Sequence, residues 1–231
     1  GQAGERAKGG TLVVTLEPCN HHGRTPPCTE HILKAGVQKV VYATKDSNPA
    51  AEGGAIFLRR HGVDVKHMTH LGADRLNAPH LTCSTKSRPH VIAKWAQTQE
   101  GFMCPPTDQE RWITTISSRI EVHRLRGRVD AILTGVGTVK ADDCRLNARL
   151  YAPRQIPLVA VASRSGSIPP EANVRKNTNF IQLTAQSPEA QLAALAEKHV
   201  QVVLLEAGPT LLNAYWQAGL IDEAWVFVGA L

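Results

Sequence analysis

Short apolar runs alternate with helical segments along the whole chain, and this alternation constrains the fold more than any other feature. In the first third, strands are predicted at 11–16, 38–44 and 63–68, with helices at 29–35 and 55–60 between them. A repeated strand–helix–strand order predicts a parallel sheet with right-handed crossovers. We expect the first strand, 11–16, to be a buried interior strand.

The same alternation resumes after a break at Ser87-Arg88-Pro89. The polar segment 71–86 shows no clear helical period in its second half and is interpreted as a linker. Beyond it, strands are predicted at 90–95, 131–135, 157–162, 200–205 and 224–228, and helices at 117–126, 188–198 and 210–218. We expect the helix at 117–126 to turn Ile120 and Leu125 toward a core. Two α/β domains are therefore predicted, 1–86 and 89–231.

Composition narrows the classes of function. Of the 231 residues 42% are hydrophobic, but no apolar run approaches the roughly 18 residues that span a membrane. The net charge of +6 suits a polyanion, and this includes a small phosphorylated molecule or a dinucleotide. Basic residues are dispersed and aromatic residues are only 5%, which argues against nucleic acid. An odd count of 5 cysteines favours a reducing, cytoplasmic compartment over a disulfide scaffold.

The most specific motif is LEPCNHHGRTPPC, in which Cys19 follows a strand and Cys28 precedes a helix. Thiolates are ligands that suit Zn²⁺, and a catalytic zinc takes three protein ligands and keeps the fourth position for water. Nucleobase deaminases combine an H-x-E motif with a P-C-x-x-C motif. Only the second motif occurs here, with a longer insert between its two cysteines. The alternatives are two buried cysteines and, for His21 and His22, a solvated pair in a loop.

Further along the chain, phosphate-binding features follow strands. Gly135-Val136-Gly137 lacks the third glycine of a dinucleotide-binding turn, so a plain strand–helix turn is the alternative. Gly208-Pro209-Thr210 begins a helix, and a helix N-terminus attracts phosphate. Arg126 and Arg149 are suited to a phosphate group, although Arg126 taken alone would be a solvated helix end. For Asp142 the alternative is a helix cap, and for Trp112 a plain core position.

Several blocks, in order, resemble the bifunctional deaminase/reductase family of riboflavin biosynthesis. They are LEPCNHHGRTPPC, AGVQKVVYATKDSNP, VHRLRGRVDAILTGVGTVKADDCRLNAR and LLEAGPTLLNAYWQAGLIDE. The resemblance implies a cytidine-deaminase-like αβα domain followed by a dihydrofolate-reductase-like α/β domain. It implies zinc-dependent deamination of 2,5-diamino-6-ribosylamino-4(3H)-pyrimidinone 5′-phosphate. Reduction of 5-amino-6-(5-phosphoribosylamino)uracil to the ribitylamino product with NADPH then follows. It also implies a homo-oligomer, with a dimer favoured.

The resemblance carries over to individual positions. The zinc ligands that the resemblance implies are Cys19 and Cys28. The pyrimidine contacts that it implies in the first domain are His21, Arg24, Asp46 and Asn48. In the second domain it implies Lys94 as a catalytic group that polarises the opened sugar aldehyde, and Arg126, Leu146, Arg149 and Glu206 as substrate contacts. The positions implied on the cofactor side are Ala96, Trp112, Thr138, Asp142, Ser163, Gly208, Pro209, Thr210, Leu211, Leu212, Asn213 and Ala214.

The chain departs from this family pattern in places. Cys144 stands for the proline of Asp-Asp-Pro, Ala207 for the first glycine of Glu-Gly-Gly, and Glu110 for a substrate serine. Thr98-Gln99-Glu100-Gly101 stands where the family shows Ser-Leu-Asp-Gly. The H-x-E motif is absent, so we expect a piece of a longer protein that by itself has no deaminase activity and binds zinc weakly. Two other hypotheses remain: a reductase with a non-catalytic deaminase-like module, and a nucleic-acid-editing deaminase.

Overall fold

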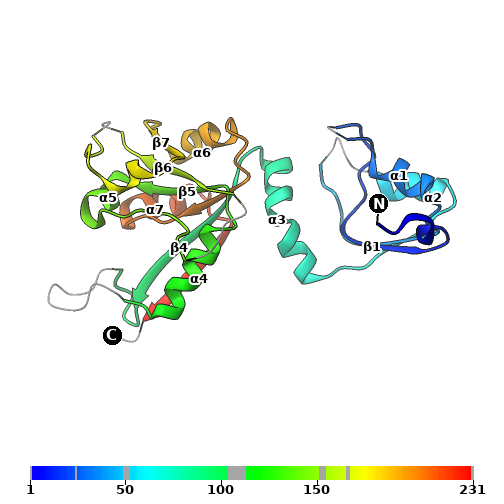
Figure 1. Cartoon of the computed structure of the whole chain (residues 1–231), viewed down its shortest axis with the longest axis horizontal. Helices are drawn as coiled ribbons and strands as arrows, with labels where there is room; N and C mark the ends of the chain where they lie inside the picture. Colours follow the sequence, from blue (N-terminus) through cyan, green and yellow to red (C-terminus); the bar gives the residue numbers. More distant parts are fainter. Residues whose placement is uncertain are drawn as a thin grey trace. The chain divides into compact units, whose positions relative to one another are not determined.

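The computed structural model divides the chain into two compact units, an N-terminal unit, Gly1–Ser87, and a C-terminal unit, Arg88–Leu231 (Figure 1). The structure describes residues 2–23, 25–48, 53–103, 113–150, 155–164 and 167–229. Within these ranges, no helix is both long enough and apolar enough to cross a membrane.

The N-terminal unit is built on a three-stranded parallel sheet of order β1-β2-β3. Its elements are η1 (Gly4–Ala7), β1 (Thr11–Leu16), α1 (Cys28–Lys34), β2 (Lys39–Thr44), α2 (Gly54–Arg60), β3 (Asp64–His67) and α3 (Leu71–Lys86). Val40 and Leu58 are fully buried in the apolar cluster between the sheet and α1 and α2. The predicted strand–helix alternation and the parallel sheet are confirmed for this unit.

The segment predicted as a linker is the 16-residue helix α3, so that prediction was wrong. The helix packs against β1 and β2 through polar side chains. Asn77 donates from Nδ2 to the Thr15 carbonyl at 2.9 Å and to Thr44 Oγ1 at 3.0 Å. Thr44 Oγ1 in turn donates to Asp74 Oδ1 at 2.8 Å. Because this interface is hydrogen-bonded, the apolar period that reveals most amphipathic helices is missing from the sequence.

The expectation of a buried strand at Thr11–Leu16 was also wrong. Residues of β1 alternate between exposed and half-buried, and Val13 is 72% exposed. β1 is an edge strand that pairs with β2 on one side. An alternating pattern is typical of a strand with one face toward the core and one toward solvent.

The C-terminal unit holds a six-stranded sheet of order β7-β6-β5-β8-β4-β9, and every neighbouring pair is parallel. Its strands are β4 (His90–Thr98), β5 (Ala131–Gly135), β6 (Leu158–Ala162), β7 (Phe180–Leu183), β8 (Val202–Leu205) and β9 (Glu223–Gly229). Its helices are α4 (Ile116–Arg126), α5 (Val136–Asp142), η2 (Asn173–Lys176), α6 (Pro188–Ala196) and α7 (Pro209–Gln217). The α/β class with parallel sheets is thus confirmed. Helix α5 and strand β7 were not predicted.

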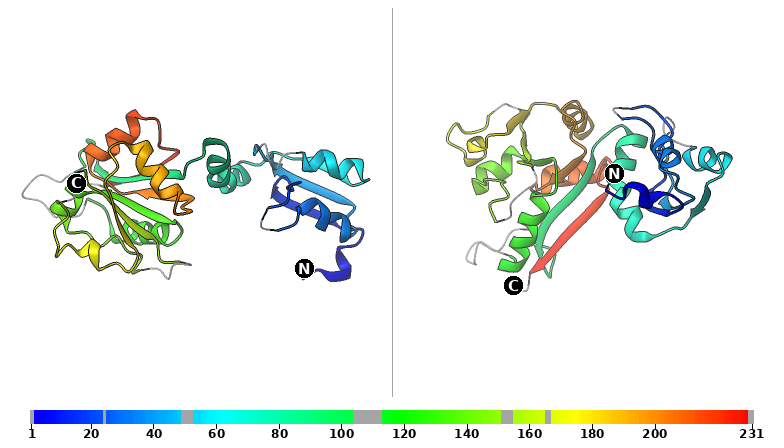
Figure 2. Two further views of the ribbon diagram at one scale, coloured as in Figure 1. Left: turned by 90° about the horizontal axis from the view of Figure 1, so that it is seen from above. Right: turned by 45° about the vertical axis from the view of Figure 1, so that its right-hand side comes forward.

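Helices cover both faces of this sheet (Figure 2). Leu133 belongs to the apolar cluster under α6 and α7, and the adjacent Ile132 belongs to the cluster with α4, α5 and η2. Strands buried on both faces read as continuous apolar runs, which is why they were visible in the sequence. Leu125 faces the core as expected, but Ile120 is 36% exposed, so its predicted place in the core was wrong.

The strand order reverses between β5 and β8. From β5 the chain continues through α5 toward β6 and the β7 edge, whereas from β8 it continues through α7 toward β9. Helices α5 and α7 lie on opposite faces, because Val139 of α5 and Tyr215 of α7 belong to different clusters. Such a reversal leaves a crevice at the carboxyl ends of the strands, where ligands of open α/β sheets bind.

Candidate active site

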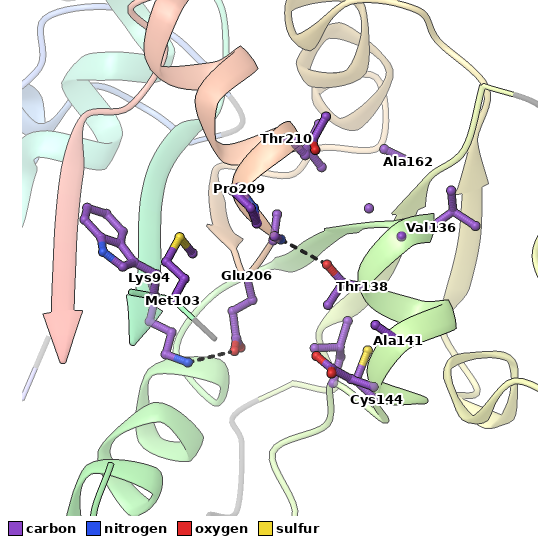
Figure 3. Close-up of a pocket in the computed structure, with 18 of the residues that line it drawn as sticks. Lys94, Met103, Val136, Thr138, Ala141, Cys144, Ala162, Glu206, Pro209 and Thr210 are labelled. Atoms are coloured by element: carbon purple, nitrogen blue, oxygen red, sulfur yellow. Dashed lines mark hydrogen bonds and ion pairs between the residues drawn. The ribbon is translucent and has the colours of Figure 1, made fainter. Parts of the chain in front are cut away.

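A cavity of about 1310 Å³ lies at this reversal. Its walls come from the carboxyl ends of β4, β5, β6 and β8, one face of α4, and the first residues of α5 and α7 (Figure 3). Its volume is above the usual range for a pocket that holds one small ligand. The cavity is therefore large enough for two ligands side by side.

At the centre of the cavity lies Glu206, a carboxylate directly after β8 whose side chain is only 8% exposed. Arg126, the last residue of α4, donates to it from Nε to Oε1 at 2.5 Å and from Nη2 to Oε2 at 2.9 Å. Lys94 Nζ, from β4, lies 3.5 Å from Oε2, and Figure 3 marks this ion pair with a dashed line. Three elements far apart in the sequence thus meet in one buried ion triad, which we call the Glu206 triad.

The charges of the triad decide the ionisation of its carboxylate. Burial alone would raise the pKa of Glu206, but Arg126 first and Lys94 second outweigh it and lower that pKa from 4.5 to about 2. Glu206 is therefore an anion at neutral pH, held between two cations. Arg126 also donates from Nη1 to the Asn147 carbonyl at 3.2 Å, which fixes its plane against the loop after α5.

One face of α4 contributes a polar stripe to the cavity wall. Arg119, Val122, His123 and Arg126 all line the cavity, at the i, i+3, i+4 and i+7 positions of the helix. His123 is buried, at 4% exposure. Its pKa is lowered from 6.5 to about 4, mainly by burial and then by the neighbouring arginines, so its imidazole is neutral at pH 7.

A second cation, Arg149, faces the same end of the cavity. Its Nη1 donates to Asn147 Oδ1 at 3.2 Å. Burial, and after it the charges of Arg126 and Arg145, lower the pKa of Arg149. Because neighbouring guanidinium groups repel one another, an anion between them would relieve this repulsion.

The opposite end of the cavity is formed by backbone and small residues. Helix α7 begins at Pro209, and the preceding Gly208 donates from its N–H to Thr138 Oγ1 at 3.0 Å. Figure 3 marks this hydrogen bond with the dashed line that ends on Thr138. A Cβ on Gly208 would lie 3.3 Å from that oxygen, so only glycine is accommodated without displacement. The amides that begin α7 and the carboxyl end of β5 together make a surface suited to phosphate.

Most of the positions predicted for the second domain lie together in this cavity. The predicted residues that line it are Lys94, Ala96, Arg126, Thr138, Asp142, Leu146, Arg149, Glu206, Gly208, Pro209, Thr210, Leu211 and Ala214. Ser163 is buried between the lining residues Ala162 and Arg164 but does not itself line the cavity, and neither do Leu212 and Asn213. Trp112 and the Glu110 departure lie outside the described residues.

Sequence reasoning missed several lining residues, among them Arg119, His123, Arg145 and Cys144. The spacing of Arg119, His123 and Arg126 on one helix face could have revealed the first two. Cys144 is visible in the sequence only as a departure from the family pattern. Burial, followed by the charge of Asp142, raises its pKa to about 11, so it remains an uncharged thiol beside the Glu206 triad.

The N-terminal unit brings the two predicted zinc ligands together. Cys19 Sγ and Cys28 Sγ are 3.2 Å apart, and Cys28 N–H donates to Cys19 Sγ at 3.4 Å. Asp46 is buried two residues after β2 and accepts from Asn48 N–H at 3.0 Å, so both lie at the carboxyl edge of the sheet. His21 has a buried Nδ1 without a partner among the described residues. Arg24 lies outside them.

A catalytic zinc needs a third donor beside these two thiols. Within the described residues, no group of three or more His, Cys, Asp or Glu side chains is placed to hold a metal ion. Among the described residues, the two thiols therefore fit zinc only in part, because they leave the ligand set of a catalytic site one protein donor short.

Comparison with known proteins shows what the chain is similar to. Residues 89–231 match the profile of the RibD C-terminal domain. The riboflavin biosynthesis protein RibD of Aquifex aeolicus is 36% identical over 253 residues, covering 99% of this chain and 71% of that protein. RibD of Mycobacterium tuberculosis (strain H37Rv) is 39% identical over 100% of this chain and 69% of that protein.

Two solved structures agree with these sequence matches. Acinetobacter baumannii RibD superposes with a TM-score of 0.85 at 35% identity, over 100% of this chain and 71% of that chain. A diaminohydroxyphosphoribosylaminopyrimidine deaminase/5-amino-6-(5-phosphoribosylamino)uracil reductase from Thermotoga maritima has a TM-score of 0.84 at 31% identity, over 96% and 68%. Both alignments include residues of both units.

Proposed function

The chain belongs to the RibD family, and from this premise we propose that its C-terminal unit is an NADPH-dependent reductase of riboflavin biosynthesis. Its substrate is 5-amino-6-(5-phosphoribosylamino)uracil, whose ribosyl chain is reduced to a ribityl chain. The observation that carries this proposal is the Glu206 triad in a cavity large enough for a cofactor and a substrate. The uncharged Cys144 thiol and the apolar residues of the cavity wall alone would not produce this pattern of charges.

The triad gives each of its residues a role. Lys94 Nζ donates a hydrogen bond to the carbonyl oxygen of the opened sugar and stabilises the negative charge that develops there during reduction. Glu206 holds Lys94 in place from 3.5 Å and, shared with Arg126, offsets one of their two positive charges. Arg126 and Arg149 bind the phosphate of the substrate at the cationic end of the cavity.

The other end of the cavity suits the cofactor. The amides at the start of α7 and the Thr138–Gly208 hydrogen bond form the cradle for the pyrophosphate of NADPH. When bound, NADPH supplies the hydride for the reduction. Ser163 has a buried hydroxyl without a partner among the described residues, and it lies next to Arg164 at the end of β6. A cofactor hydroxyl or phosphate that reached this strand end would give that hydroxyl a partner.

The test is a steady-state assay of NADPH oxidation with the aminouracil substrate. We expect Lys94→Ala to lower kcat by about 100-fold or more, as loss of a transition-state hydrogen-bond donor does. Lys198→Ala, at an exposed lysine after α6, is the matched control and should have the wild-type rate. A wild-type rate for Lys94→Ala, with unchanged unfolding, would refute the assignment.

We further propose that the N-terminal unit corresponds to the deaminase domain of this family, which deaminates the pyrimidine before the reduction. The supporting observation is the pair of thiols, Cys19 and Cys28, 3.2 Å apart at the carboxyl edge of the sheet. The alternative is a reductase with a non-catalytic deaminase-like unit. A homodimer, as expected from the family resemblance, stays a prediction.

Zinc binding and ammonia release test this second proposal. We expect the 231-residue chain to bind Zn²⁺ weakly and to release no ammonia from the diaminopyrimidine, since it supplies two thiol donors and no H-x-E. Cys19→Ser should abolish the weak zinc binding, whereas the control Cys83→Ser should leave it unchanged. Equal zinc binding by wild type and Cys19→Ser would contradict a metal role for this pair.

A further inference from the structure

The cationic end of the cavity has an excess of hydrogen-bond donors. Arg119, Arg126, Arg149 and Lys94 line it, and guanidinium and ammonium groups donate hydrogen bonds but accept none. The carboxylate of Glu206 already accepts from Arg126 and Lys94 through both of its oxygens. A bare phosphate needs only donors, but the hydroxyl groups of a sugar chain also need acceptors.

His123 is placed to be such an acceptor. It lies between Arg119 and Arg126 on the cavity face of α4, and it is buried at 4% exposure. Its Nδ1 has no hydrogen-bond partner among the described residues. A buried polar atom without a partner is unusual in folded proteins and is destabilising, so a role in packing alone does not account for it.

The surroundings of His123 also keep its ring uncharged. The groups that act on it are Arg126 and Arg119 of α4, Arg149 of the loop after α5, and Glu206 after β8. The three cations oppose protonation, and the single carboxylate that favours it is shared with Arg126 and Lys94. A neutral imidazole has one N–H donor and one nitrogen that accepts, which no cation on this face of α4 can offer.

We propose that His123 is a further binding residue of this cavity, whose neutral imidazole accepts a hydrogen bond from a hydroxyl of the sugar–phosphate chain held by Arg126 and Arg149. This inference rests on the proposed function for the identity of the complete substrate. The pairing of an acceptor with neighbouring cations favours a phosphorylated polyol as the ligand class. His123 would thereby distinguish a sugar phosphate from a bare anion.

The test compares two probes, ribose 5-phosphate and inorganic phosphate, by calorimetric titration of the whole chain. His123→Leu removes both ring nitrogens and His123→Gln keeps a neutral acceptor and donor. We expect His123→Leu to bind ribose 5-phosphate several-fold to about tenfold more weakly, as loss of one neutral hydrogen bond does, with inorganic phosphate unchanged. His123→Gln should recover most of the loss. The matched control His199→Asn, at an exposed turn, should bind both probes as the wild type does.

Steady-state kinetics provide a second readout. In His123→Leu, the KM for the aminouracil substrate should rise while the KM for NADPH is unchanged, because the stripe on α4 lies at the substrate end. Equal binding of ribose 5-phosphate by wild type and His123→Leu would overturn the proposal. So would an equal loss for both probes, which would indicate a general effect on the fold or on anions. A different result is that the wild type fails to oxidise NADPH while His123→Leu still weakens the binding of ribose 5-phosphate and not that of inorganic phosphate. In that case the proposed function fails and the role of His123 stands.

Discussion

Replacing Glu206 by glutamine isolates the contribution of the buried carboxylate to stability. The side chain keeps its size, but the negative charge that Arg126 and Lys94 share is lost. Arg126 is 12% exposed in its side chain, so its charge would remain buried without a counter-ion. Removing one partner of a buried ion pair costs about 3–5 kcal/mol.

The lowered pKa of Glu206 leads to a similar magnitude. Lowering that pKa from 4.5 to about 2 corresponds to a preference of about 3 kcal/mol for the charged form in the folded state. Because the folded pKa lies below the unfolded one, this stability is present above pH 4.5 and is lost as pH falls toward 2. Both values therefore predict that Glu206→Gln lowers the free energy of unfolding at pH 7 by about 3 kcal/mol.

Urea unfolding followed by tryptophan fluorescence measures this loss of stability in the C-terminal unit. All 4 tryptophans of the chain, at positions 95, 112, 216 and 225, belong to the C-terminal unit. With a typical dependence of about 2 kcal/mol per molar urea, the midpoint should fall by about 1.5 M. Circular dichroism would report any accompanying change in the N-terminal unit.

A double variant decides whether the ion pair is the cause. In Glu206→Gln/Arg126→Met neither the carboxylate nor the guanidinium remains, and Lys94, at 18% exposure of its side chain, can still reach solvent. The double variant should then be more stable than the sum of the two single losses predicts, by about 2 kcal/mol. Strict additivity would show that the two charges do not stabilise one another and would refute the reasoning.

Three further outcomes follow from particular contacts. The unfolding free energy should fall by up to about 3 kcal/mol as pH drops from 6.5 toward 4, since His123 has a folded pKa of about 4, and His123→Gln should remove this slope in urea titrations. Thr138→Val removes the partner of Gly208 N–H, so it should raise the KM for NADPH and not that for the aminouracil. Gly54→Ala would place a Cβ 1.8 Å from the Pro18 carbonyl oxygen and should destabilise the N-terminal unit by about 2 kcal/mol, seen by circular dichroism with unchanged tryptophan unfolding.

The sequence predicted elements whose burial produces an apolar pattern and missed those held by polar contacts. Strands β5 and β6 are buried on both faces and were found with nearly correct ends. Helix α3 was missed because Asn77 and Asp74 make its contacts with the sheet. Helix α5 was missed because it begins in a glycine-containing turn, where helical propensity is low.

The candidate site divides in the same way. Gly208 was available from the order of elements, because it precedes a helix start, and Glu206 was available from the family resemblance. The pairing of Glu206 with Arg126 and Lys94 was not, because it joins residues separated by 80 and 112 positions. Only the strand order β5-β8-β4 brings these three residues to one point, and that order is set by packing across the whole sheet.

This topology also explains where the positive charge of the chain acts. Among the described residues, six lysine and arginine side chains and three carboxylates line the cavity, so half of the net charge of +6 is concentrated there. A nucleic-acid surface would need cations spread over an exposed face, with aromatic groups for stacking. Here the surplus charge lines the cavity around the buried Glu206, which offsets one of the two positive charges of Lys94 and Arg126 and holds both side chains as fixed donors. The carboxylate thus weakens the attraction of the cavity for anions in general. Recognition of a small phosphorylated ligand then depends on groups such as His123 that form hydrogen bonds with its hydroxyls.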